Sequence, residues 1–169
     1  VNYTSEINTH IDPVYDHGTN VAGVLGAKTN NTTGIAGVSG GNHSKGITIL
    51  PYCVGNSFLF ETNSIDDAIL DAVDKGVKVI NISLSVPYST SIESAIDDAY
   101  TNNVTIVCAT GNHNRDSIAY PASNENTIAV GALGNNNERS YFSNYGTGLD
   151  LVAPGEGIYS TTFYNQYAY

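Results

Sequence analysis

From Ile47 onward the sequence alternates between short apolar runs and stretches with apolar residues at every third or fourth position. The runs are rich in Val, Ile and Thr, which favour strands, whereas the periodic stretches predict amphipathic helices. This strand–helix–strand rhythm is typical of a parallel sheet in the α/β class. The predicted strands cover residues 47–54, 77–85, 104–110, 126–133 and 149–154, and the predicted helices cover residues 64–76 and 91–103.

Each predicted helix has one apolar face. Ser64 is suited to accept the free amide hydrogens at the start of the first helix, and Gly76 permits the chain to leave it. In parallel α/β sheets the working residues lie in loops beyond the carboxyl ends of the strands. The two apolar faces consist of Ile65, Ala68, Ile69, Ala72 and Val73, and of Ile92, Ala95, Ile96 and Ala99.

The charge balance excludes some partners. The 169 residues suffice for one domain, and 16 acidic against 6 basic side chains give a formal net charge of −10. Such a surface repels phosphate backbones and anionic lipids, so we expect neither nucleic acid nor a membrane as partner. No apolar run has the length of a membrane span. Cys53 and Cys108 both lie in apolar strand-like runs, where we expect buried free thiols, although one disulfide stays possible.

The stretch HGTNVAG at 17–23 raises the question of what His17 does. A lone histidine at this place would be a surface residue or would cap a helix. Imidazole, however, titrates in the range that suits a general base, and Gly18 would allow a close approach of backbone. Small residues such as Ala22 and Gly23 would keep the helix thin where it packs. The choice depends on the rest of the chain.

Four stretches in the same order as in one known family decide between these alternatives. HGTNVAG resembles the histidine motif of subtilisin-like serine proteases, usually written HGTHVAG, and NISLS at 81–85 resembles their substrate-binding strand. ATGN at 109–112 resembles the segment that ends in their oxyanion asparagine, and YFSNYGTGLDLVAPGEGIYST at 141–161 resembles the run before their nucleophile loop. The resemblance implies a three-layer α/β fold, with a mostly parallel sheet and helices on both faces.

The same resemblance implies roles for individual residues. His17 would be the general base and acid, and the Asn112 side chain would donate a hydrogen bond to the oxyanion of the tetrahedral intermediate. An extended polypeptide substrate would add as a strand beside residues 83–85. The first specificity pocket would have residues 109–111 as its far wall, with Tyr-Pro-Ala at 120–122 nearby. The implied substrate-binding residues are Ser83, Leu84, Ser85, Ala109, Thr110 and Gly111.

KTNNTTGIAGV at 28–38 resembles the calcium loop of the family, especially in its thermitase-like form. By that resemblance the Asn31 side chain and the carbonyls of Lys28, Thr33 and Ile35 would hold Ca²⁺, a hard cation that prefers oxygen. The family also uses carboxylates from upstream, so we expect a structural site that is incomplete here. A polar loop without metal is the alternative. Catalysis itself requires no cofactor.

Two parts of the catalytic triad have no match in the sequence. The aspartate motif D-T/S-G does not precede His17, the serine motif G-T-S-M-A is absent, and GTG at 146–148 does not replace it. Asp16 is badly placed to reach the far ring nitrogen of its neighbour, and Asp12 is the only other local candidate. We therefore expect residues 1–169 to form one partial catalytic domain, truncated at both ends. Alone, it is expected not to turn over substrate and to be marginally stable or to self-associate.

Two other functions stay open. Asn20, Asp16 and Ser85 depart from the family pattern and would fit a non-catalytic relative that binds peptides or proteins. An unrelated nucleotide-binding α/β domain would need a glycine-rich phosphate loop after a strand, which the sequence lacks. For the protease, the acidic charge and the habit of the family indicate secretion or the cell surface, and a pro-segment is a further expected partner.

Overall fold

The structure is a computed structural model that describes residues 16–42, 44–55, 62–162, 164 and 166–169; at Thr62 and Asn63 it describes the backbone alone. The chain divides into two compact units. Unit 1 consists of Val1–Leu59 and Gly157–Tyr169, and unit 2 of Phe60–Glu156. Each unit is described by itself, and the expectation of one domain over 1–169 stays a prediction.

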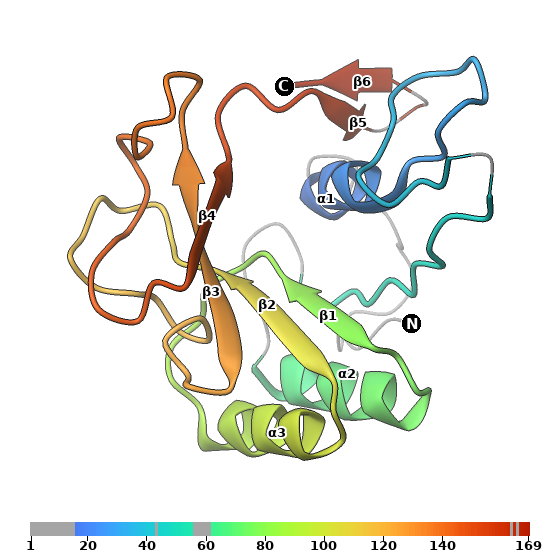
Figure 1. Cartoon of the computed structure of the whole chain (residues 1–169). Coiled ribbons are helices and arrows are strands. Elements are labelled where there is room, and N and C mark those ends of the chain that lie inside the picture. Colours follow the sequence, from blue (N-terminus) through green and yellow to red (C-terminus); the bar gives the residue numbers. More distant parts are fainter. Residues whose placement is uncertain (1–15, 43, 56–61, 163, 165) are drawn as a thin grey trace. The chain divides into compact units, whose positions relative to one another are not determined.

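Unit 2 contains a parallel sheet of four strands in the order β1-β2-β3-β4 (Figure 1). The strands are β1 (Val79–Ile82), β2 (Thr105–Ala109), β3 (Thr127–Leu133) and β4 (Leu151–Pro154). Ile82 pairs with Cys108 and Cys108 with Ala129, so the carboxyl ends of β1, β2 and β3 lie at one edge of the sheet. The sequence-based prediction of a parallel α/β fold is confirmed.

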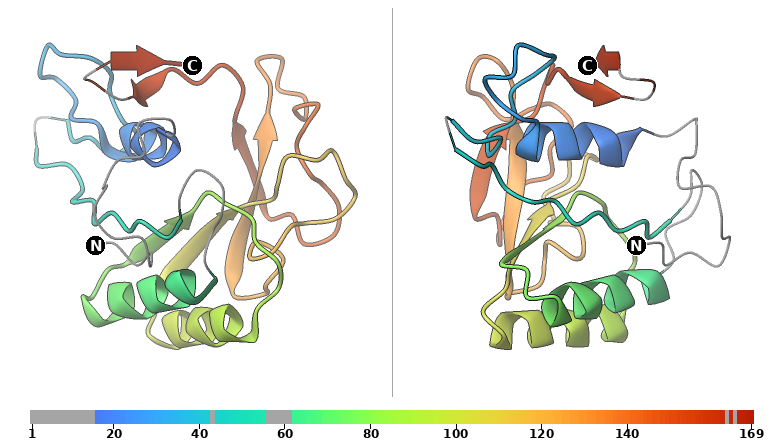
Figure 2. Two further views of the ribbon diagram at one scale, coloured as in Figure 1. Left: turned by 180° about the vertical axis from the view of Figure 1, so that it is seen from behind. Right: turned by 90° about the vertical axis from the view of Figure 1, so that its right-hand side faces the viewer.

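Helices α2 (Thr62–Asp74) and α3 (Thr90–Thr101) lie side by side in unit 2, as Figures 1 and 2 show. α3 connects β1 to its parallel neighbour β2, the crossover that a parallel pair requires. Both helices bury the apolar faces expected from the sequence, except that Val73 is only half-buried. On the sheet, the buried side chains of Ile82, Ile106, Cys108 and Ala129 share one face, whereas Val79 on the opposite face is 62% exposed.

The two helices end in the same way. After α2, the N–H of Gly76 donates to the Val73 carbonyl (2.8 Å) and the N–H of Val77 to that of Ala72 (3.2 Å). After α3, Asn103 donates to Tyr100 (3.0 Å) and Val104 to Ala99 (2.9 Å). This is the Schellman motif, in which one residue takes a left-handed conformation. That residue is Gly76 with φ +72° in the first case and Asn103 with φ +57° in the second.

Unit 1 combines helix α1 (His17–Gly26) with an antiparallel pair, β5 (Ser160–Thr162) and β6 (Gln166–Ala168) (Figure 1). β5 packs directly on α1 at Gly23. A Cβ atom added to Gly23 would lie 2.2 Å from the Thr161 hydroxyl oxygen, so only glycine allows this contact. The expected thin helix is therefore present at Gly23, although its neighbour Ala22 is only half-buried.

One predicted strand is not formed and two predicted boundaries are wrong. Residues 47–54 form no strand; only isolated bridge pairings occur, at Cys53 and Gly55, and Ile47 is 51% exposed. β1 ends at Ile82, so residues 83–85 follow the strand instead of belonging to it. α2 begins at Thr62, so Ser64 lies inside its first turn, buried. Separately, no helix within the described ranges is long and apolar enough to cross a membrane.

Candidate active site

His17 is the first residue of α1 and is exposed. The helix start expected from the sequence is confirmed, with Asp16 at the N-cap position. Gly18 follows in open space, because no atom of the described residues lies within 4 Å of the position that its Cβ would take. The close backbone approach expected at Gly18 is thus not seen there, whereas it occurs one turn and a half later at Gly23.

Asp16 occupies the N-cap but makes no side-chain hydrogen bond to the helix amides. Its carboxylate instead accepts a hydrogen bond from the Thr162 hydroxyl of β5. This contact gives Asp16 a structural partner on β5, and the expectation that Asp16 does not orient the His17 ring stays a prediction. The other local carboxylate considered, Asp12, lies outside the described residues.

Asn112 lies in the loop that follows the carboxyl end of β2, and it is exposed. The residues before it are anchored. Thr110 is 1% exposed, its N–H donates to the Val130 carbonyl (3.1 Å), and its own carbonyl accepts from Ala119 (3.0 Å). Ala109 ends β2 half-buried, and Gly111 has φ +102°, a conformation that favours glycine. An anchored loop thus presents an exposed amide side chain.

The segment 83–85 lies beside this loop, because β1 and β2 are parallel neighbours and Ile82 pairs with Cys108. Ser83 and Leu84 are half-buried and Ser85 is exposed. The Asn81 side chain donates to the Ser83 hydroxyl (2.9 Å). β1 and β2 are neighbours in the sheet, so the structure brings residues 83–85 and residues 109–111 together at the carboxyl ends of these two strands.

The Tyr-Pro-Ala segment at 120–122 is hydrogen-bonded to the residues that follow segment 83–85. The N–H of Val86 donates to the Tyr120 carbonyl (3.0 Å), and the Tyr120 hydroxyl donates to the Ser89 carbonyl (3.2 Å). The rings of Tyr88 and Tyr120 meet edge to face at 5.3 Å between centroids. Burial, with a smaller contribution from the negative charge of Glu93, raises the pKa of Tyr120 to about 12, so its hydroxyl stays a neutral donor at neutral pH.

The expected calcium loop belongs to unit 1 and is tightly curled. Asn30, Thr32 and Gly34 all have positive φ, at 56°, 59° and 65°, which is uncommon for a β-branched residue such as Thr32. The Asn31 side-chain oxygen accepts a hydrogen bond from the N–H of Thr33 (3.1 Å). Lys28, Asn31 and Thr33 are exposed and Ile35 is half-buried. In the part of the chain that the structure describes, no three His, Cys, Asp or Glu side chains gather as metal ligands.

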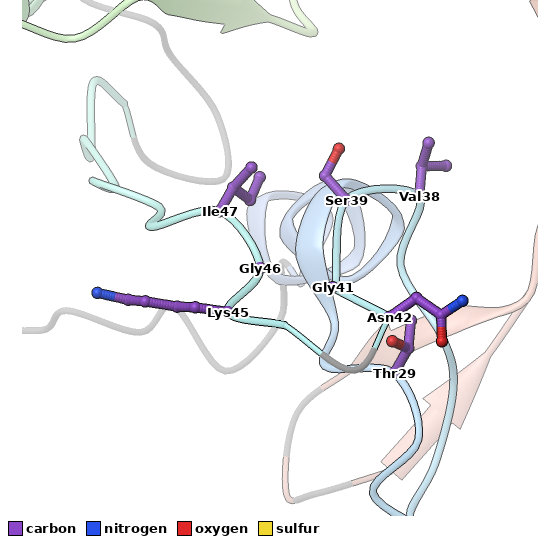
Figure 3. A pocket seen from close by; sticks show the side chains of 8 residues that line it. All are labelled: Thr29, Val38, Ser39, Gly41, Asn42, Lys45, Gly46 and Ile47. Carbon is purple, nitrogen blue, oxygen red and sulfur yellow. The ribbon is translucent and has the colours of Figure 1, made fainter.

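A shallow pocket of about 380 Å³ lies in unit 1, and Figure 3 shows its lining side chains. Thr29 and Asn42 lie on one side of it, and Lys45 extends away from them. The Thr29 hydroxyl is buried and forms no hydrogen bond with the described residues. The pocket contains none of the residues implied for catalysis, substrate or metal. The lining residues are Thr29, Val38, Ser39, Gly41, Asn42, Lys45, Gly46 and Ile47.

The cysteines are both free thiols, as expected. Cys108 is buried at 1% exposure, and burial raises its pKa to about 12, which makes it an inert thiol at neutral pH. Cys53 is only half-buried and donates to the Gly55 carbonyl (3.4 Å). Sequence reasoning missed one residue near the candidate site, Asn144, whose buried side chain binds the Asn112 loop across 34 positions of sequence. A contact between residues so far apart in the sequence cannot be predicted from local periodicity.

Comparisons with known proteins agree with the family resemblance of the sequence motifs. The model of the subtilase family of peptidases matches residues 2–169. The chain is 41% identical to a thermophilic serine proteinase of Bacillus sp. (strain AK1) over 96% of this chain and 40% of that protein. It is 40% identical to Subtilisin Savinase of Lederbergia lenta over 86% of this chain and 52% of that protein. The chain therefore spans about half the length, or less, of these relatives.

Solved structures give the same answer for the fold. The protease domain of PatA, solved as its S218A mutant, superposes with a TM-score of 0.79 and 26% identity, over 90% of this chain and 56% of that one. The prenylagaramide maturation protease PagA superposes with a TM-score of 0.64 and 28% identity, over 69% and 46%. The sequence motifs, the parallel sheet and these relatives agree, and they show that the chain belongs to the subtilase family of serine proteases.

Proposed function

We propose that the protein containing this chain is a subtilisin-like serine endopeptidase that hydrolyses peptide bonds through an acyl-enzyme. The observation that carries the proposal is the exposed Asn112 on an anchored loop at the carboxyl end of β2, beside β1, which is an edge strand among the strands described. An extended polypeptide would pair with main-chain groups of residues 83–85 and extend past residues 109–112. Family membership and relatives that are about 40% identical support this assignment.

In the proposed mechanism His17 takes the proton from the attacking serine hydroxyl and later gives it to the leaving amine. The Asn112 amide donates a hydrogen bond to the oxyanion that forms on the scissile carbonyl. The serine nucleophile and the orienting carboxylate are assigned to parts of the parent protein outside these 169 residues, since neither motif occurs within them. Asp16 is not assigned the second role, and its carboxylate accepts a hydrogen bond from the Thr162 hydroxyl.

The proposal includes a structural calcium ion in the loop 28–35. The donors in question are the Asn31 side-chain oxygen and the carbonyls of Lys28, Thr33 and Ile35, an oxygen-only set of the kind Ca²⁺ prefers. The tight curl of the loop supports it, with positive φ at the alternate residues Asn30, Thr32 and Gly34, which lie among the proposed ligand residues. An increase of the unfolding temperature in Ca²⁺, absent in Asn31→Ala, is the expected result.

Activity is tested on the full-length parent protein with a fluorogenic peptide library. Hydrolysis that disappears in His17→Ala and falls about 10²–10³-fold in Asn112→Ala is the expected result. The isolated chain is expected to be inactive, and hydrolysis by it that His17→Ala abolishes would contradict our assignment of the nucleophile. A parent that binds peptides without cleaving them would instead be the non-catalytic relative. Export is tested by finding the protein in the culture medium.

A further inference from the structure

Asn144 holds the Asn112 loop from both sides. It is 3% exposed and lies between β3 and β4. Its side-chain nitrogen donates to the Thr110 carbonyl (2.9 Å), two residues before Asn112. Its side-chain oxygen accepts from the N–H groups of His113 (2.9 Å) and Arg115 (3.2 Å), just after Asn112. One buried side chain therefore makes three hydrogen bonds to the main chain that flanks the candidate oxyanion donor.

The main chain of the same residue adds two contacts. The Asn144 N–H donates to the Gly111 carbonyl (2.9 Å), and its carbonyl accepts from the Thr110 hydroxyl (3.4 Å). The packing is tight, because a Cβ added to Gly111 would lie 2.6 Å from the Asn144 side-chain nitrogen. Residues 111–115 belong to no helix or strand, so hydrogen bonds to neighbouring segments hold the loop. Besides those of Asn144, the N–H of Asn114 donates to the Phe142 carbonyl (2.7 Å) and the N–H of Tyr145 to the Arg115 carbonyl (3.0 Å).

We propose that Asn144 is a positioning residue for the oxyanion hole, which fixes the main chain around Asn112 so that its amide is aimed before the substrate arrives. This inference rests on the proposed function. Asn112 is exposed, whereas Asn144 is buried and acts through it. A donor that is already oriented stabilises the developing oxyanion without the cost of reorganising during the reaction. Misplacing such a donor by about 1 Å can lower the rate about 10²-fold.

The hydrogen-bond pattern requires asparagine. The site needs one donor, facing the Thr110 carbonyl, and one acceptor, facing two N–H groups. Aspartate would keep the acceptor and place an oxygen against the Thr110 carbonyl, where two acceptors repel each other. Leucine has a similar shape and removes all three bonds, so the N–H groups of His113 and Arg115 lose this acceptor, whereas the Thr110 carbonyl keeps the N–H of Ala119. The two variants thus separate loss of the donor from loss of the whole anchor.

The experiment is a double-mutant cycle in the full-length parent protein. Asn144→Asp is expected to lower kcat about 10- to 100-fold with KM changed less than about threefold. In an Asn112→Ala background the same change is expected to lower kcat less than about twofold, because the group that it positions is gone. Asn124→Asp is the matched control, since that side chain also accepts a main-chain N–H, from Asn126 at 2.7 Å, and is expected to leave kcat unchanged.

Equal losses of kcat in both backgrounds, or no loss in either, would overturn the positioning role. Hydrogen exchange on the unmutated protein gives a second readout that does not depend on how the variants fold. The amides of His113 and Arg115 are expected to exchange at least about 100-fold more slowly than in an unstructured peptide. Free exchange at both would also overturn the inference. A parent without hydrolytic activity would refute the proposed function, and the exchange rates would still report on the loop.

Discussion

The Ser160 hydroxyl donates a hydrogen bond to the main-chain carbonyl of Asn20 at 2.7 Å, although 140 residues separate them in the sequence. The neighbouring Thr161 hydroxyl donates to the Thr19 carbonyl, also at 2.7 Å. Ser160 is fully buried, and β5 packs against Gly23 so closely that an added Cβ would overlap it. These contacts fix β5 to the helix that begins at His17, so the stability of unit 1 depends on them.

Gly23→Ala is expected to destabilise unit 1 by about 1–3 kcal/mol, because the new methyl group would overlap the side chains of β5. Its carbon atom would lie 2.2 Å from the Thr161 hydroxyl oxygen and 2.5 Å from that of Ser160. Urea unfolding of the purified chain measures the change. Gly18→Ala in the same helix is the control, since its Cβ meets no described atom within 4 Å, and it is expected to stabilise by up to about 1 kcal/mol. Equal effects of both substitutions would contradict the close packing.

The ends of α2 and α3 predict opposite effects for two substitutions at equivalent positions. Asn103→Gly is expected to stabilise by a few tenths to about 1 kcal/mol, because glycine takes the left-handed conformation without steric cost. Gly76→Ala is expected to destabilise by about 1 kcal/mol for the converse reason, since its Cβ would meet nothing within 4 Å and only the φ of +72° opposes it. Thermal unfolding measures both, and changes of the same sign would refute the shared Schellman geometry.

Alkaline pH is expected to destabilise unit 2 through Cys108. Burial raises the pKa of this thiol to about 12 from 9.0, so the folded protein holds the proton more tightly than the unfolded chain. The stabilisation is complete below about pH 9 and is lost as the pH rises toward 12, by up to about 1.4 kcal/mol per pH unit. Urea unfolding at a series of pH values measures the slope. Cys108→Ala is expected to reduce the slope, and the slope that remains includes the contribution of Tyr120, whose pKa is also raised to about 12.

The isolated chain is expected to self-associate through its exposed sheet edges. β1 and β4 are the two edges of the described sheet, and both carry exposed apolar side chains. Val79 on β1 is 62% exposed, and Leu151 and Val152 on β4 are 57% and 48% exposed. Such edges are templates for pairing with a second chain. Sedimentation velocity is expected to show species larger than a monomer as concentration rises.

Val152→Lys is expected to reduce this association, because an edge lysine disfavours strand pairing. Asn135→Lys adds the same charge in an exposed loop and serves as the control for net charge. A monomer with a sharp unfolding transition that does not depend on concentration would contradict the expectation.

Most of unit 2 could be predicted from the sequence. The helical periodicity of Ile92, Ala95, Ile96 and Ala99 predicted α3, and these four side chains are the buried ones. Short apolar runs predicted β2, β3 and β4, because their signals lie within a few consecutive residues. The motifs likewise located His17 at a helix start and Asn112 beyond the carboxyl end of a strand.

Other features were missed or predicted wrongly because they depend on distant partners. Residues 47–54 have strand composition but form no strand, since a strand requires a neighbour that supplies main-chain hydrogen bonds. β5 and β6 were missed because Ser-Thr-Thr and Gln-Tyr-Ala show no apolar alternation. Their pairing is set by the register of Ser160 with Ala168.

The sequence by itself determined the family, the α/β class, the main helices and the residues with candidate chemistry, since local periodicity and short motifs encode all of these. Only the tertiary structure decided that Thr162 binds Asp16, that β5 packs on Gly23, and that Asn144 anchors the loop of Asn112. Hydrogen bonds and close contacts between distant residues form when folding brings buried polar groups together and each must find a partner. That requirement acts in three dimensions, and no short stretch of sequence expresses it.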